Sequence, residues 1–127
     1  MGSAAQPLAE RVVLVVDDEP MACRITARVL VDAGFRVVEV HSAFETVALL
    51  STLDGKVHLV VSDIAMPGMT GVQLAAQMAD RWPAVPVLLI SGHGGPPAGY
   101  PGAFLPKPFT WDVLLDAIAR LVPLQNH

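Results

Sequence analysis

The sequence has little cysteine, few charged residues and no long apolar run, and each shortage excludes a class of protein. Its single cysteine, Cys23, cannot form an internal disulfide, which fits a reducing compartment. No apolar run approaches the roughly 20 residues that a transmembrane helix needs. Residues 1–7 also lack the basic segment and apolar core of a signal peptide. We therefore expect a cytoplasmic protein with no membrane insertion.

Positive charge is scarce as well. Eight Lys and Arg residues face 12 Asp and Glu residues, for a net charge of -4. Because nucleic-acid-binding modules normally have a basic patch, we expect no direct nucleic-acid binding. Hydrophobic residues make up 53% of the 127 residues, which is enough for one globular domain with a single core. We expect a disordered N-terminal segment at residues 1–10, the domain at 11–122 and a C-terminal tail at 123–127.

Short apolar runs alternate with segments of helical spacing along the chain. The runs predict strands, and the spaced segments predict helices. Proline at position 20 suits the first turn of a helix whose apolar residues include Met21, Ile25 and Val29, and Gly34 suits its end. The alternation predicts a parallel sheet with helices on both faces. The expected strands are 12–16, 35–40, 57–62, 85–90 and 103–105; the expected helices are 20–32, 43–50, 71–79 and one beginning after Thr110.

Polar side chains stand at the ends of four of these strands. Asp17 and Asp18 follow the first strand, Asp63 ends the third, Ser91 follows the fourth and Lys107 follows the fifth. With a strand order of 2-1-3-4-5, the carboxylates of the first and third strands meet at one edge of the sheet. Carboxylates at close quarters repel each other, and Mg²⁺ relieves that repulsion. With a lysine and a hydroxyl nearby, the pattern indicates a site for a phosphoryl group on or beside a carboxylate.

These motifs resemble the receiver domain of two-component response regulators, the CheY-like module that accepts a phosphoryl group. The resemblance extends over residues 11–122 and implies a flavodoxin-like, doubly wound, five-stranded parallel sheet of order 2-1-3-4-5. The matching pieces are Val-Asp-Asp at 16–18, Asp63 with Met66-Pro67-Gly68-Met69-x-Gly71, Ser91-Gly92, and Lys107-Pro108-Phe109.

One stretch departs from the family pattern. Receiver domains usually form their fourth helix between the hydroxyl residue and the lysine, but only fifteen residues separate Ser91 from Lys107 here. Four of the first nine residues from Ser91 are Gly and two are Pro, which disfavours a regular helix. We expect an irregular or degenerate fourth helix, with an irregular or mobile segment at 92–102.

The resemblance also implies roles at the site. Asp63 would be the nucleophile that accepts the phosphoryl group. Asp18 would bind Mg²⁺ directly, Asp17 largely through water, and the Ala65 carbonyl would complete the protein ligands. The alternative for Asp17 and Asp18 is a simple helix cap.

The same resemblance implies further features of the site. Lys107 and Ser91 would contact the phosphoryl oxygens, and the Lys107-Pro108 peptide would be cis. Phe104 occupies the position of an aromatic residue that rotates on activation in the family, although it fits a plain core position equally well. The small Ala65 would leave hydrolytic water fairly free access to the phosphoryl site.

The function implied is that of a signalling switch, which we do not class as an enzyme. A sensor histidine kinase or phosphotransfer protein would donate the phosphoryl group, and an unknown downstream protein would respond. A stand-alone regulator and a receiver from a larger protein both fit.

One alternative is a receiver-like interaction module that works without phosphorylation. A haloacid-dehalogenase-type aspartyl-phosphate phosphatase would need a second acid where Ala65 stands. The four histidines lack metal-ligand spacing, which argues against a zinc site.

Overall fold

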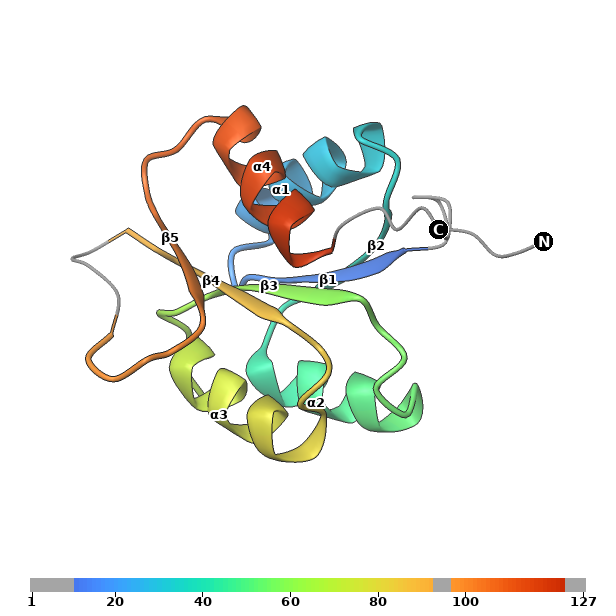
Figure 1. Ribbon diagram of the computed structural model, residues 1–127, viewed down its shortest axis with the longest axis vertical. Helices are drawn as coiled ribbons and strands as arrows, with labels where there is room; N and C mark the ends of the chain where they lie inside the picture. The colour runs from blue at the N-terminus through green and yellow to red at the C-terminus, as the bar shows by residue number, and fades with distance from the viewer. Residues whose placement is uncertain (1–10, 93–96, 123–127) are drawn as a thin grey trace.

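The structure is a computed structural model that describes residues 11–92 and 97–122. Those ranges contain five strands, which form one sheet, and four helices (Figure 1). Helices α1 and α4 cover one face of the sheet, and α2 and α3 cover the other. In chain order the elements are β1 (Val12–Val16), α1 (Pro20–Asp32), β2 (Arg36–Val40), α2 (Ala43–Thr52), β3 (Leu59–Asp63), α3 (Gly71–Arg81), β4 (Val87–Ser91), β5 (Ala103–Pro106) and α4 (Trp111–Leu121).

The strand order is β2-β1-β3-β4-β5, and every neighbouring pair is parallel, as predicted. Val16 of β1 is in register with Ser62 of β3, and Asp63 is in register with Ile90 of β4. The carboxyl ends of these central strands therefore lie side by side at one edge of the sheet.

The core consists of two apolar layers separated by the sheet. Side chains of β1 alternate between them: Val13 and Val15 pack with α1 and α4, whereas Leu14 and Val16 pack with α2 and α3. All four are almost completely buried. Burial on both faces explains why β1 is a continuous apolar run.

Helix α1 forms over the predicted range, but not all of the apolar residues whose spacing predicted it face the sheet. Its buried residues are Cys23, Ala27 and Leu30, while Met21 and Ile25 are 74% and 51% exposed. Both sets repeat at helical spacing, so spacing alone does not distinguish them. Cys23 and Ala27 are small, which lets the helix backbone lie close to the sheet.

Several element boundaries also differ from the predicted ones. Helix α2 continues to Thr52, although Ser51 and Thr52 were expected to interrupt it. The Thr52 hydroxyl donates a hydrogen bond to the carbonyl oxygen of Ala48 (3.1 Å), a bond that a helix accommodates. The second, third and fourth strands begin one or two residues later than predicted, and the last three strands end one residue later.

The connection between β4 and β5 contains no helix within its described residues, Gly92 and 97–102. Gly99 has a positive φ of 76° in a turn, a conformation that suits glycine. An irregular connection was expected here; residues 93–96 of it, and the predicted terminal segments 1–10 and 123–127, lie outside the described residues. Among the helices of the described ranges, none has the length and apolar character needed to cross a bilayer.

Candidate functional site

The strand ends bring the predicted acidic residues together. Asp17 directly follows β1, and Asp63 is the last residue of β3. Carboxylate oxygens of Asp17, Asp18 and Asp63 all lie within 4.8 Å of one another. We call this group the acidic pocket. It arises because β1 and β3 are adjacent and parallel.

Two backbone features hold the β1 side of the acidic pocket. The Asp17 N–H donates to the carbonyl oxygen of Val40 (3.0 Å), which ties the end of β1 to β2. The Asp17 Oδ1 atom accepts a hydrogen bond from the Glu19 N–H (2.9 Å), just before α1 begins. The N-cap residue of α1 is Glu19, so the helix-cap alternative for Asp17 and Asp18 is wrong in its simple form. Asp17 is nearly buried, whereas Asp18 is exposed to solvent.

Lys107 lies across the pocket from these two aspartates. Its Nζ atom is 3.5 Å from Asp63 Oδ1, with side-chain exposures of 44% for the lysine and 19% for the aspartate. The Lys107 N–H donates to the carbonyl oxygen of Ser91 (2.8 Å), and the Lys107-Pro108 peptide is cis, as the resemblance implied. The end of β4 therefore fixes the backbone from which the lysine reaches Asp63.

The electrostatics of the pocket favour a bound cation. Burial raises the pKa of Asp63 above its usual value, and the charges of Asp17 and Asp18 raise it further, against the opposing charge of Lys107. The pocket thus concentrates negative charge at a partly desolvated carboxyl group. Three carboxylates provide the hard oxygen ligands that Mg²⁺ prefers, so this donor set fits Mg²⁺.

The backbone on the far side of Asp63 is packed against the start of α3. The Gly71 N–H donates to the carbonyl oxygen of Ile64 (2.9 Å). A Cβ atom at Gly71 would overlap the carbonyl oxygen of Asp63, so glycine is needed here for space. Thr70 and Gln73 form a reciprocal capping box that fixes the first turn of α3. The loop after β3 is therefore anchored at both ends.

The remaining predicted site residues lie at or near the same edge. Ser91 is the last residue of β4, and Ala65 is exposed in the loop that follows β3. Phe104 is half-buried on β5, in register with Leu89. Among the described residues, no hydrogen bond or ion pair joins Phe104 to Asp63, so its switching role stays a prediction.

An apolar pocket, not predicted from the sequence, lies beside the acidic pocket. This pocket, of about 380 Å³, lies between α1 and α4, and its lining includes Ile25, Phe109 and Trp111 together with Asp63 and Lys107. Phe109 and Trp111 meet edge to face with ring centroids 6.0 Å apart. The sequence did contain a sign of this pocket, namely apolar residues of α1 that lie outside the stripe packed on the sheet.

Comparison with known proteins identifies similar chains. The sequence model of the family described as response regulator receiver domain matches residues 13–119. The C4-dicarboxylate transport transcriptional regulatory protein DctD of Pseudomonas aeruginosa is 36% identical over 126 residues, which cover 93% of this chain and 26% of DctD. Sensor kinase CckA of Brucella abortus is 31% identical over 120 residues, which cover 90% of this chain and 13% of the kinase.

Solved structures agree with the sequence comparison. A response regulator receiver protein from Sinorhizobium medicae has a TM-score of 0.81 and 31% identity, covering 91% of this chain and 96% of that one. The receiver domain of the hybrid histidine kinase CckA has a TM-score of 0.76 and 28% identity, covering 87% and 98%. The chain thus matches isolated receiver domains over nearly their whole length, but spans about a quarter of DctD and less of CckA.

Proposed function

Because the chain belongs to the response regulator receiver domain family, we propose that it accepts a phosphoryl group on Asp63 with the help of Mg²⁺. The observation that supports this most directly is the placement of Asp63 between two further carboxylates and Lys107. In this role the chain is a signalling switch of a two-component system. The phosphatase alternative is not favoured, since the position of its second acid is the exposed Ala65.

The proposed reaction uses groups that already face one another. A carboxylate oxygen of Asp63 attacks the phosphorus of a donor phosphohistidine; the new P–O bond forms as the P–N bond breaks, and the departing imidazole takes up a proton. Lys107 lies where its ammonium group would offset charge on the phosphoryl oxygens, and the Ser91 hydroxyl would donate a hydrogen bond to one of them. Mg²⁺, held by Asp17, Asp18 and Asp63 with the Ala65 carbonyl, would supply further charge neutralisation.

Phosphorylation would then shift the protein between two packings of the same fold. The phosphoryl group adds about -1.5 to -2 charges at neutral pH. Hydrogen bonding to Ser91 would favour the packing in which the end of β4 lies closer to Asp63. Phe104, on the neighbouring strand β5, would report this change through its side-chain orientation. The mechanism is a shift in populations.

The apolar pocket supports a protein as the phosphoryl donor, namely a histidine kinase or a phosphotransfer protein. Ile25 and Trp111 are 51% and 42% exposed and line the pocket that contains Asp63. Exposed apolar surface beside a reactive carboxylate suits a docking helix that presents a phosphohistidine. Ile25→Ser should slow transfer from a phosphorylated kinase domain at least tenfold, with little change for a small-molecule donor. Val31→Ser, also exposed on α1 but outside this pocket, is the control; equal slowing in both variants would argue against docking here.

The central experiment is intact mass spectrometry after incubation with Mg²⁺ and a small-molecule phosphodonor. We expect one phosphoryl adduct that requires Mg²⁺, disappears in Asp63→Asn and forms at least tenfold more slowly in Lys107→Gln. Lys56→Gln, which removes an exposed lysine elsewhere, should behave as the unaltered protein. An adduct that persists in Asp63→Asn would place the acceptor elsewhere. No adduct together with no Mg²⁺ binding would favour the module that works without phosphorylation.

A further inference from the structure

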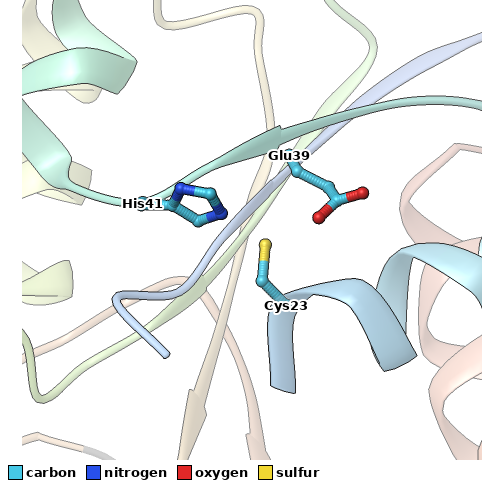
Figure 2. A group of neighbouring side chains, drawn as sticks. All are labelled: Cys23, Glu39 and His41. Atoms are coloured by element: carbon cyan, nitrogen blue, oxygen red, sulfur yellow. The ribbon is translucent and has the colours of Figure 1, made fainter. Parts of the chain in front are cut away.

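A second group of metal-binding side chains lies where α1 packs on β2. Figure 2 shows Cys23 of α1 facing Glu39 of β2 and His41, which follows β2. One ligand atom from each residue lies within 4.8 Å of the others. We call these three residues the mixed cluster. None of them has a part in the phosphoryl chemistry proposed above.

The geometry of the mixed cluster follows from the packing of two elements. Glu39 and His41 are two residues apart along extended chain, which places their side chains on the same side. Cys23 belongs to the buried stripe of α1 that lies over that side. Its Sγ atom lies 3.4 Å from the carbonyl oxygen of Val15 and 3.9 Å from that of Val40, so the thiol can donate a weak hydrogen bond to either. Burial and these weak hydrogen bonds together hold the sulfur in place.

The two other side chains are free to reorient toward a cation. Glu39 forms an ion pair with Arg24 (3.0 Å), but Arg24 is 75% exposed, and such pairs contribute little. Within the described residues, the imidazole of His41 makes no hydrogen bond or ion pair, and its ring points toward Cys23 and Glu39 (Figure 2). Glu39 is partly exposed and His41 is exposed, so neither side chain has to leave tight packing to become a ligand.

We propose that Cys23, Glu39 and His41 bind a borderline divalent cation, with Zn²⁺ as the best fit. Sulfur, imidazole nitrogen and carboxylate oxygen together form the donor set that Zn²⁺ accepts, and three protein ligands leave a fourth position for water. On binding, the Cys23 thiol loses its proton to solvent and a metal–sulfur bond replaces the S–H bond. This site differs in ligand chemistry from the all-oxygen acidic pocket, and the proposal does not depend on phosphorylation.

A reactive, redox-sensing thiol is the main alternative role for Cys23, and its surroundings argue against it. The side chain is fully buried. Burial, followed by the charge of Glu39, raises the pKa of the thiol to about 11. A buried thiol that stays protonated at neutral pH is a poor nucleophile. A cation beside Glu39 would offset the charge that disfavours the thiolate.

Cobalt titration of the full chain tests the site, because Co²⁺ binds Zn²⁺ sites and reports sulfur ligation by a thiolate-to-cobalt charge-transfer absorption. Excess Mg²⁺ is kept present to occupy the acidic pocket. We expect the absorption to appear at one equivalent of Co²⁺ and to disappear when Zn²⁺ is added. Cys23→Ala should abolish it. His41→Asn and Glu39→Gln should weaken binding at least as much as the roughly 10–100-fold lost when outer-shell partners are removed.

Two control variants separate the mixed cluster from its surroundings. Asp63→Asn should leave the cobalt absorption unchanged, since it removes an acidic-pocket ligand only. Asp32→Asn breaks another exposed ion pair of α1, that of Arg28 and Asp32 (3.1 Å), without removing a proposed ligand, and should also have no effect. His41 is exposed, so His41→Asn keeps the test valid even if Cys23→Ala does not fold. Absence of sulfur-to-cobalt absorption in the unaltered protein, or cobalt binding unchanged by His41→Asn, would overturn the proposal.

Discussion

The acidic pocket and the mixed cluster are both groups of three side chains at the carboxyl edge of the sheet, yet they are built differently. The acidic pocket is fixed by the backbone: hydrogen bonds join Asp17 to Val40, Ile64 to Ile90 and Lys107 to Ser91. The mixed cluster depends on side chains, one buried and the others able to reorient. A rigid backbone would suit the proposed phosphoryl transfer, which needs defined geometry, whereas the proposed metal ion would gather adaptable ligands around itself.

The largest effect should come from Gly71→Ala, which disturbs the backbone that supports the acidic pocket. The added methyl group would overlap the Asp63 carbonyl oxygen, and overpacking of this kind costs about 1–3 kcal/mol of unfolding free energy. We expect urea unfolding to show that loss and phosphorylation to slow, while cobalt binding at the mixed cluster is unchanged. Gly92→Ala, where the nearest atom would be 3.9 Å away, is the stability control. Equal stability of the Gly71→Ala variant and the unaltered protein would contradict this account.

An intermediate effect is expected from Asp63→Asn measured without Mg²⁺. The pKa of Asp63 is raised in the folded protein, so the folded state binds more protons than the unfolded state above the ordinary value of 3.8, and stability falls as pH rises through the folded pKa. Removing the carboxylate should therefore stabilise the fold at neutral pH, by on the order of 1 kcal/mol.

The dependence on pH and Mg²⁺ makes this prediction specific. The gain from Asp63→Asn should shrink in urea unfolding experiments as pH falls through the folded pKa, and should be largely gone below 3.8. It should reverse in saturating Mg²⁺, which stabilises only the protein that binds it. Glu39→Gln should change stability at neutral pH by less than about 0.5 kcal/mol, since its ion pair is exposed. Destabilisation by Asp63→Asn without Mg²⁺ would mean that the attraction between Lys107 and the Asp63 carboxylate outweighs the cost of burying that carboxylate.

The smallest effects should come from removing either of two exposed ion pairs formed by arginines of α1. Arg24→Gln and Arg28→Gln should each alter unfolding free energy by less than about 1 kcal/mol. Arg24→Gln also releases Glu39, so cobalt should bind roughly 1.5–5-fold more tightly, the equivalent of about 0.2–1 kcal/mol. Arg28→Gln should leave cobalt affinity unchanged because its partner is Asp32. The same cobalt affinity in both variants would show that the Arg24–Glu39 pair does not compete with the metal.

The acidic pocket could be predicted from sequence because strand topology creates it. Asp17 and Asp63 follow apolar runs, and parallel strands place such ends at one edge once their order is known. The strand order itself came with the family resemblance. The described residues of the connection before β5 contain no helix, and this too was predicted, from the glycines and prolines of that segment. Local signals and topology were sufficient for both.

The mixed cluster could not be predicted in this way. Cys23 lies within α1, and its neighbours depend on which stripe of the helix faces the sheet. Helical spacing predicted the helix but not its buried stripe, because small buried residues and exposed large apolar residues share the same helical period. Histidine spacing argued against zinc, yet only one of the proposed ligands is a histidine. Glu39 lies on β2, His41 follows β2, and Cys23 comes from the helix that precedes it. A site assembled by packing leaves no fixed spacing in the sequence.

The contact between Gly71 and Asp63 has a consequence for how a signal could leave the site. A neighbouring side chain could absorb a small displacement of the Asp63 peptide by changing its rotamer, but here the neighbour is the backbone of α3. A backbone in a capped first turn has no rotamer to change. A displacement of the Asp63 peptide would therefore press on the backbone of α3, and movement of the whole helix would relieve that contact, which is the kind of all-or-none response that tightly packed interfaces favour.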